Sequence, residues 1–535
     1  MSETGQLYFG GEIYTVDPSR PRAEAVAVRQ GQILAVGSES ECRAALGSSY
    51  EPLDLKQGTM LPGFIDTHLH PVVMVFYDLN VDLRAAASIP ELQNKLREAA
   101  PARSPNTWLV GLNFDEQHLP DPRLPTRHDL DAACPDRPVL VIKHDAHMVI
   151  ANSKAIEALA ITAATPDPPA GAIDREPGGY PAGPFRETAA QMALSAMPMP
   201  EIPRFLQGAQ ATFHKLVAHG ITSAGIVLQT NEEGPAGAAG AFDLLAMQLL
   251  IGQVPIGLYG ILIADSLEKI EAARRTKLHQ GETGPHRIGA VKIFSDGSFG
   301  SCTAWMREPY TDHPGQRGWL MHDSEEIFRR MALAHQAGLQ VCAHAIGDAA
   351  NRLCVDLYRR LLRDYPKRDH RHRIEHASLV DAQTIADMAR LGVVVSTQPL
   401  FIHSEKEWLH KRLGPERARW TYPLRAFLDA GIRVAGASDA PIESVDVLHA
   451  IQCCVTREGF EPQQGITAAE AVRMFTLDAA FAQFEETIKG SIQLGKRADF
   501  VILSANPASV PAEKIRDIRV EKTIIGGQVR YARES

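Results

Sequence analysis

The chain has 535 residues, more than one hydrophobic core usually serves, so two or three structural units are expected. With 45% hydrophobic and 22% charged residues, its composition is typical of a soluble globular enzyme. The formal net charge of -9 argues against nucleic acid as a partner, because binding nucleic acid requires a basic surface that neutralises phosphates. We expect a small-molecule substrate, and the composition leaves a homo-oligomer open.

The start of the chain and its cysteines bear on the compartment. MSETGQLYFGGEIYTV has no basic region leading into an apolar stretch, so no secretory signal is expected. No apolar run approaches the roughly 18 residues of a membrane span, and no membrane association is expected. The seven cysteines are scattered without CxxC spacing, which is typical of reduced thiols in a cytoplasmic protein.

Both ends of the chain have the alternation of β-strands. The N-terminal segment contains LYFGGEIYTV and AVAVRQGQILAVGS, and the C-terminal segment contains RADFVILSANP and RVEKTIIGGQVRY. Gly, Pro and Asp interrupt these short runs, as they do between strands of a sandwich. We predict one small β-sandwich that is built from residues 1–60 and 488–535.

Between the ends, short apolar runs alternate with helix-like stretches such as 324–338 and 379–392. The candidate strands are 64–70, 221–228, 254–260, 290–294, 339–345, 372–377, 392–399 and 433–440. Eight parallel strands with crossover helices close into a (β/α)8 TIM-like barrel of the α/β class, whose active site is built at the carboxyl ends of the strands. We assign residues 61–71 and 206–487 to this barrel.

The first two candidate strands are separated by far more chain than a usual crossover needs. The intervening segment contains a strand-like run at 138–144 and a helix-like run at 90–100. We interpret residues 72–205 as an inserted α/β lobe that covers the barrel mouth. Its Pro- and Gly-rich stretch at 165–184 is interpreted as an ordered loop.

Four histidines and one aspartate stand at the ends of candidate strands. His68 and His70 form an HxH pair, and alternate residues of a strand point to the same face. His344, His376 and Asp439 end three other strands. A single histidine here is more often structural, and an aspartate often caps the next helix. Five such residues at one rim predict a metal site instead.

Lys292 lies between Val and Ile in the candidate strand AVKIF. A lysine there either extends its ammonium group to solvent or has lost its charge. Reaction with carbon dioxide would give an anionic carbamate that can bridge two cations. The alternative is a free amine that acts on the substrate.

Six motifs occur in an order that resembles the amidohydrolase superfamily: LPGFIDTHLHP, VKIFSDGSFGSCTA, HAIGDAA, HRIEHASL, SDAP and GSIQLGKRADFVIL. Within it, the chain resembles the branch of the N-substituted formamide deformylases, amidohydrolase family 3. WLVGLNFDE and GAIDREPGGYPAGPFRE in the inserted segment are also similar to this branch, so the resemblance covers nearly the whole chain. Asp-Ala-His at 145–147 departs from the more usual Asp-Gly-His.

The resemblance implies a binuclear centre and a fixed set of ligands. One metal would be held by His68, His70 and Asp439, the second by His344 and His376, and carboxylated Lys292 would bridge the two. Imidazole, carboxylate and carbamate ligands suit zinc, with other divalent transition metals possible.

We predict hydrolysis of a C–N bond, in an amide or an N-formyl or N-acyl amine, by metal-activated hydroxide. Asp439 would act as the general base and then as the general acid. Alternatives are a mononuclear deaminase and a lactone or ester hydrolase of the same superfamily. A non-catalytic binding barrel is a third class, which predicts the loss of ligands, and here all six are present.

Further residues are assigned supporting roles. His147 and Glu187 in the inserted segment and Trp305 after the fourth strand are candidates for substrate contact. The aromatic residues that follow strand ends, where binding pockets often have aromatic walls, also include Phe401, Trp408 and Trp420. The candidates for orienting the ligand histidines are Asp66, Asp296 and Asp348.

Overall fold

The computed structural model describes residues 4–534, apart from 104–106, 117–118, 121–122, 144–147, 169–170, 196–200, 232–239 and 241. The chain divides into two compact units. Unit 1 comprises Met1–Pro71, Phe213–Thr230 and Phe242–Ser535, and unit 2 comprises Val72–Thr212 and Asn231–Ala241.

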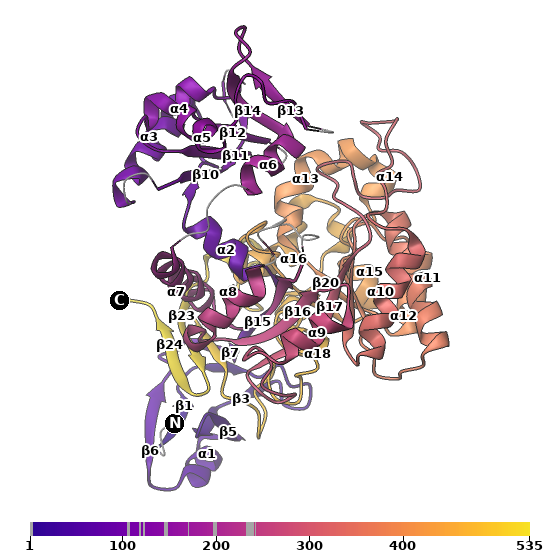
Figure 1. The fold of residues 1–535 in the computed structure, drawn as a ribbon. Coiled ribbons are helices and arrows are strands. Elements are labelled where there is room, and N and C mark those ends of the chain that lie inside the picture. The colour runs from indigo at the N-terminus through magenta and orange to yellow at the C-terminus, as the bar shows by residue number, and fades with distance from the viewer. Residues whose placement is uncertain are drawn as a thin grey trace. The chain divides into compact units, whose positions relative to one another are not determined.

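The centre of unit 1 is an eight-stranded parallel sheet whose strands follow one another in chain order (Figure 1). Its strands are β8 (Phe64–Leu69), β15 (Ile221–Gln229), β16 (Gly257–Ile263), β17 (His286–Phe294), β18 (Gln340–Ala345), β19 (Arg373–His376), β20 (Val394–Thr397) and β21 (Val434–Gly436). Each overlaps one of the eight predicted segments, so the prediction of a TIM-like barrel is confirmed.

Backbone hydrogen bonds join the first strand of this sheet to the chain that follows the last. The amide of Asp439 donates to the carbonyl of His68 at 2.8 Å, and the amide of His70 donates to the carbonyl of Ala440 at 2.8 Å. The chain segments that carry His68 and Asp439 are therefore held side by side at the carboxyl end of the barrel.

The third barrel strand begins later than predicted. The sequence places its start at Val254, but β16 begins at Gly257, whose partner on β15 is Ser223. Pro255 has no backbone N–H to contribute to a ladder, which accounts for the shift. The strand extends correspondingly further, to Ile263.

Helices lie between the barrel strands in the chain, and the last three of those given next follow β21. They are α7 (Ile202–Ala218), α8 (Asp243–Leu250), α9 (Leu267–Arg274), α10 (Ser324–Gln336), α11 (Asp348–Asp364), α12 (Ala382–Leu391), α13 (Leu400–Leu413), α14 (Pro415–Ala418), α15 (Leu424–Asp429), α16 (Val447–Thr456), α17 (Ala468–Met474) and α18 (Leu477–Ala482). In α10, the Asp323 side chain accepts hydrogen bonds from the first turn, and Ile327, Met331 and Ala334 form the buried stripe of an amphipathic helix.

Two further sheets of unit 1 contain the terminal segments. One has the order β5 (Gln32–Gly37), β4 (Ala25–Arg29), β1 (Gly5–Phe9), β6 (Tyr50–Asp54). The other has the order β24 (Gln528–Ala532), β23 (Val520–Ile525), β22 (Phe500–Leu503), β7 (Thr59–Pro62), β2 (Glu12–Tyr14), β3 (Arg22–Ala23). Helix α1 (Glu39–Leu46) lies between β5 and β6 in the chain. Strands from opposite ends of the chain thus pair directly.

The two terminal sheets share a hydrophobic cluster. Tyr8 and Val26 come from the first sheet, and Met60, Phe500 and Ile524 come from the second. The rings of Tyr8 and Phe500 meet edge to face with centroids 5.6 Å apart, a favourable arrangement for aromatic pairs. The core of these sheets therefore depends on both ends of the chain.

Unit 2 contains a six-stranded sheet. Its order is β13 (Gly171–Arg175), β14 (Pro181–Glu187), β12 (Met148–Ala151), β11 (Val139–Lys143), β10 (Leu109–Phe114), β9 (Val81–Asp82). Its helices include α2 (Pro71–Asp78), α3 (Ile89–Ala99), α4 (Arg127–Ala133), α5 (Ser153–Ala158) and α6 (Thr188–Ser195).

The interpretation of 165–184 as loop is wrong for its second half. β13 and β14 form an antiparallel hairpin there, with Ile173 opposite Phe185. The turn is closed by a hydrogen bond from the amide of Gly179, which has a φ of +81°, to the carbonyl of Glu176. Pro and Gly are common in loops, but in this segment they lie in and around the turn of a hairpin.

Two further observations concern membrane-spanning helices and cysteines. Within the described residues, no helix combines the length and the apolar character needed to cross a bilayer. All seven cysteines are free and buried, as the prediction of reduced thiols requires.

The shared terminal core gives a test of stability. Phe500→Ala should lower the free energy of unfolding by about 3–5 kcal/mol, because it removes a fully buried ring that contacts both sheets. Val529→Ala on β24 of the same sheet, where the side chain is 53% exposed, should change it by less than about 0.5 kcal/mol. Urea denaturation of both variants measures the difference, and equal effects would contradict the role of the shared core.

Candidate metal centre

Three predicted ligands meet at the carboxyl end of the barrel. His68 is in β8, His70 is the first residue after it, and Asp439 follows β21. Asp439 Oδ1 lies 3.0 Å from His70 Nε2 and 3.4 Å from His68 Nε2. All three residues are buried, and their ligand atoms form a group that could hold a metal ion.

Glu375 orients His68. The Nδ1–H of His68 donates to Glu375 Oε2 at 2.5 Å, which fixes the ring in one tautomer and leaves the lone pair of Nε2 available. On the other side, Glu375 accepts from Nε of Arg373 at 2.5 Å, and Arg373 donates to the carbonyl of Thr67 at 3.0 Å. Both side chains of this ion pair are completely buried.

His376 is oriented by an amide. Its Nδ1 donates to Gln398 Oε1 at 2.9 Å, so its Nε2 is free to bind a metal. The backbone of His376 has a φ of +71°, which is rare for a residue other than glycine. In a regular strand His376 would face away from Glu375, whereas here its ring lies beside that of His68, with centroids 5.4 Å apart.

His344 completes the group of imidazoles. Its Nε2 donates to the carbonyl of Gly297 at 3.1 Å, and its ring centroid lies 4.5 Å from that of His376. The buried Nδ1 of His344 has no hydrogen-bond partner in the part of the chain that the structure describes. A buried acceptor without a partner is costly, and a metal ion at this nitrogen would satisfy it.

Lys292 extends from β17 into the same group. Its Nζ lies 3.1 Å from His68 Nε2 and 5.2 Å from the ring centroid of Phe294. Burial lowers the pKa of Lys292, since no solvent stabilises the ammonium form. The amine is thus placed among the predicted ligands with its charged form disfavoured.

The electrostatics favour neutral imidazoles beside two carboxylates. Burial, followed by the positive charge of Lys292, lowers the pKa of His68 to about 4 and that of His344 to about 3. Burial raises the pKa of Glu375, but Arg373 and His68 outweigh it and hold the pKa well below its usual value. Neutral imidazoles and ionised carboxylates are the forms that bind metals.

Asp439 also has a depressed pKa. Burial raises it, but the hydrogen bond from His70 and the nearby imidazoles His68 and His376 have the larger combined effect and lower it. Asp439 has a φ of +58°, a second positive value at this rim. Such conformations persist where the surrounding structure enforces them, and they are common at functional sites.

The aspartates expected to orient ligands contact mostly backbone. Asp66 accepts from the amides of His68 and Ser438, and so fixes the chain around two predicted ligands. Asp296 accepts from the amides of Trp305, Ile346 and Gly347. Its carboxylate also lies 3.5 Å from His344 Nε2.

Asp348 and the aromatic candidates have packing roles. Asp348 accepts from the amide of Arg307 and begins α11. Trp408 and Trp420 are partly buried against the cluster that contains Phe401. Of these aromatics, Phe401 is stacked on His376, with ring centroids 6.2 Å apart.

The candidates for substrate contact are only partly described. His147 lies outside the described residues, and so does the side chain of Glu187, whose backbone ends β14. Trp305 is half-buried, and its amide donates to Asp296 at 2.8 Å.

Sequence reasoning missed Glu375 and Gln398, which orient imidazoles, and Arg373, which pairs with Glu375. Arg373 and Glu375 alternate with Ile374 in HRIEH, and that period of two places both on one face of β19. This was a usable signal. Gln398 had none, because nothing in STQP distinguishes it from a surface glutamine.

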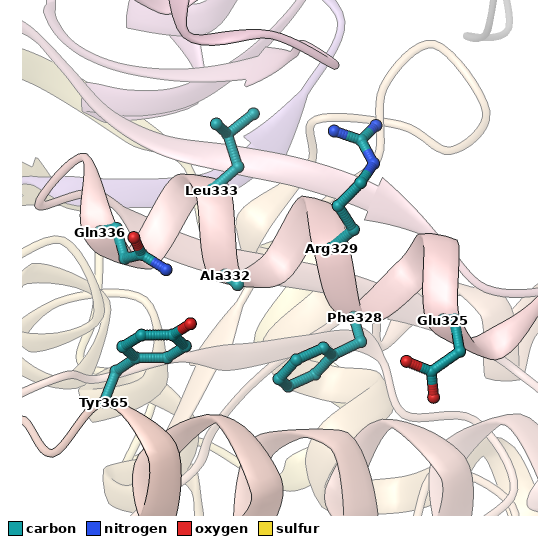
Figure 2. A pocket seen from close by; sticks show the side chains of 7 residues that line it. All are labelled: Glu325, Phe328, Arg329, Ala332, Leu333, Gln336 and Tyr365. Atoms are coloured by element: carbon teal, nitrogen blue, oxygen red, sulfur yellow. The ribbon is translucent and has the colours of Figure 1, made fainter.

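A surface pocket lies elsewhere, along α10 (Figure 2). Its lining residues are Glu325, Phe328, Arg329, Ala332, Leu333, Gln336 and Tyr365. None of the predicted ligands lines it, so this pocket is distinct from the candidate metal centre.

The chain belongs to the amidohydrolase family, whose pattern matches residues 51–531, and it is a hydrolase. It is 30% identical to the putative amidohydrolase YtcJ of Bacillus subtilis, over 98% of this chain and 99% of that protein. It is 29% identical to the N-substituted formamide deformylase of Arthrobacter pascens, over 98% of each. The resemblance drawn from the motifs is confirmed.

Solved structures agree with this assignment. An uncharacterized metal-dependent hydrolase from Pyrococcus horikoshii OT3 matches with a TM-score of 0.79 and 26% identity, covering 95% of this chain and 99% of that one. One from Pyrococcus furiosus matches with a TM-score of 0.78 and 28% identity, over 94% of this chain and 100% of that one.

The buried ion pair gives the next prediction. Glu375→Gln should destabilise the protein by about 3–5 kcal/mol, because Arg373 would be left charged and unpaired in the barrel. Glu416→Gln, which breaks the exposed pair with Arg419, should cost no more than about 1 kcal/mol. Thermal unfolding of both variants tests this. Adding Arg373→Met to Glu375→Gln should recover part of the loss, and an additive loss would contradict it.

Proposed function

We propose that the chain is a metal-dependent hydrolase that cleaves the C–N bond of an N-formyl or N-acyl amine or a related amide. The observation that carries the proposal is the convergence of four histidines with the ionised carboxylate of Asp439 at the barrel rim. Family membership and the similarity to a formamide deformylase and to two metal-dependent hydrolases support it.

The donor set fits divalent cations. His68 and His376 each donate one ring N–H to a protein acceptor and so turn the other nitrogen toward the centre, while His344 has an unpartnered Nδ1. Together with His70 and Asp439 they would hold zinc or a similar metal. Bound there, such a cation supplies Lewis acidity and lowers the pKa of a water molecule from about 15.7 to about 7.

Asp439 is the proposed proton carrier. Its buried carboxylate is ionised, so it can accept the proton of the attacking water and deliver it to the leaving amine. The hydrogen bond from His70 orients the carboxylate. Gln398 and Glu375 keep His376 and His68 in the tautomers that this chemistry requires.

Lys292 is the proposed bridge between two metals. Its neutral amine can attack carbon dioxide, forming an N–C bond and releasing one proton to give a carbamate. The carbamate replaces the amine with an anion that offers two oxygens. The mononuclear alternative, in which Lys292 remains an amine as in a deaminase of this superfamily, predicts one metal per chain. A lactone or ester hydrolase would use the same rim.

The proposal includes the predicted inserted lobe and the candidates for substrate contact. Residues 72–205 would cover the barrel mouth and bring His147 and Glu187 to the substrate, with Trp305 on the barrel side. A crystal structure with a bound substrate analogue tests this, and it would be wrong if none of the three residues contacted the analogue.

The activity itself can be tested with a panel of N-formyl amines, N-acyl amines, cyclic amides and lactones. We expect turnover of a C–N substrate that His344→Asn lowers by more than about 100-fold, since even an outer partner of a ligand is worth about 10–100-fold. His128→Asn, at an exposed histidine of unit 2, is the matched control and should retain activity. Turnover of lactones alone would favour the alternative.

The bridge can be tested by chemical rescue. Lys292→Ala should lose metal and activity, and formate or acetate should restore part of both by occupying the position of the carbamate. The same carboxylates should not rescue His344→Asn, which lacks an imidazole. Elemental analysis of the parent protein should find two metals per chain, and one metal with no rescue would favour the mononuclear enzyme.

A further inference from the structure

A second group of metal-binding side chains lies outside the centre described above. His403 is in α13, His449 is in α16, and Glu458 is in the short 3-10 helix η5 (Arg457–Gly459). Their ligand atoms lie within 4.8 Å of one another. We refer to these three residues as the helix clamp.

Both histidines of the helix clamp face the same carboxylate. His403 Nδ1 lies 2.9 Å from Glu458 Oε2, and His449 Nε2 lies 3.1 Å from Glu458 Oε1. In a tetrahedral zinc site with bonds of about 2.0–2.1 Å, neighbouring ligand atoms are about 3.3 Å apart. Each imidazole nitrogen therefore needs to move only a few tenths of an ångström away from the Glu458 carboxylate to admit a cation.

A thiol stands beside the clamp. Cys453 follows His449 by four residues in α16, so both lie on one face of the helix. Its Sγ is 3.5 Å from Glu458 Oε1, and its side chain is buried. Two imidazoles, a carboxylate and a thiol are the donor types of zinc sites. They come from α13 and from the continuous segment of α16 and η5. The thiol is not in the group whose ligand atoms lie within 4.8 Å of one another, so Cys453 must move toward a bound cation.

We propose that the helix clamp, with Cys453 as fourth ligand, binds a divalent transition-metal cation such as zinc. Binding releases the thiol proton to solvent, so the thiolate and the Glu458 carboxylate together neutralise the two charges of the cation. Lys406, whose Nζ lies 2.5 Å from Glu458 Oε2, is partly exposed and turns to solvent when the cation replaces it.

A cation at the clamp would fix α13 against α16. Phe401, which is stacked on His376, is two residues before His403 in α13, and Gln398 is two residues before the start of that helix. The clamp would therefore hold the segment that orients a predicted ligand of the barrel centre. Its role is structural, and it does not depend on the proposed activity.

Metal content tests the proposal. The full-length protein is stripped with a chelator, reloaded with zinc or cobalt and dialysed against metal-free buffer. His449→Ala should then retain one cation per chain fewer than the parent, and Glu458→Gln should lose the same one. The matched control is His410→Ala, which removes another histidine of α13 that pairs with a single glutamate, Glu461, and it should bind as the parent does.

The cobalt-loaded protein reports on the thiol. The parent should have a thiolate-to-cobalt charge-transfer band in the near ultraviolet that Cys453→Ser abolishes and Cys454→Ser retains. His344→Asn should retain the band, because the barrel centre is separate. Circular dichroism of the stripped variants checks their folding. Equal metal content in the parent and in both His449→Ala and Glu458→Gln would overturn the proposal and leave a hydrogen-bonded cluster only.

Discussion

Glu375 holds a fully buried negative charge in the barrel, and the arrangement of the rim depends on how that charge is balanced. Arg373 neutralises it on one side, and on the other side His68 donates a hydrogen bond to the carboxylate. Because burial disfavours the protonated imidazoles, the carboxylate orients His68 without protonating it. Gln398 does the same for His376 with a neutral oxygen. The lone pairs of His68 and His376 thus face the centre of the rim, and the groups that orient these imidazoles lie behind them.

Much of this architecture could be predicted from the sequence. Apolar runs separated by helical periodicity predict the eight strands, because burial on both faces of a parallel strand excludes polar residues from its interior. Side chains at the carboxyl ends of such strands must converge, so His68, His344, His376 and Asp439 could be grouped without coordinates. The shared sheet of the two termini was also visible as an alternation of apolar and polar residues at each end.

The remaining features depend on tertiary structure. The positive φ of His376 turns its side chain away from the direction that strand alternation predicts. The sequence contains no signal for this backbone conformation. Gln398 acquires its role only because β20 lies next to β19. The Pro- and Gly-rich segment forms a hairpin because β14 also pairs with β12. This long-range pairing outweighs the local composition. The helix clamp likewise exists only where α13 and α16 meet.

The pairing of β7 with β22 also has a consequence for synthesis. Leu61 is made roughly 440 residues before its partner Val501. At about 5–20 residues per second, a ribosome takes between roughly 20 and 90 s to produce the missing strand. During that interval β7 has one unpaired edge, which is a template for association with other nascent chains. The partner that completes this edge is therefore supplied only when translation has nearly ended.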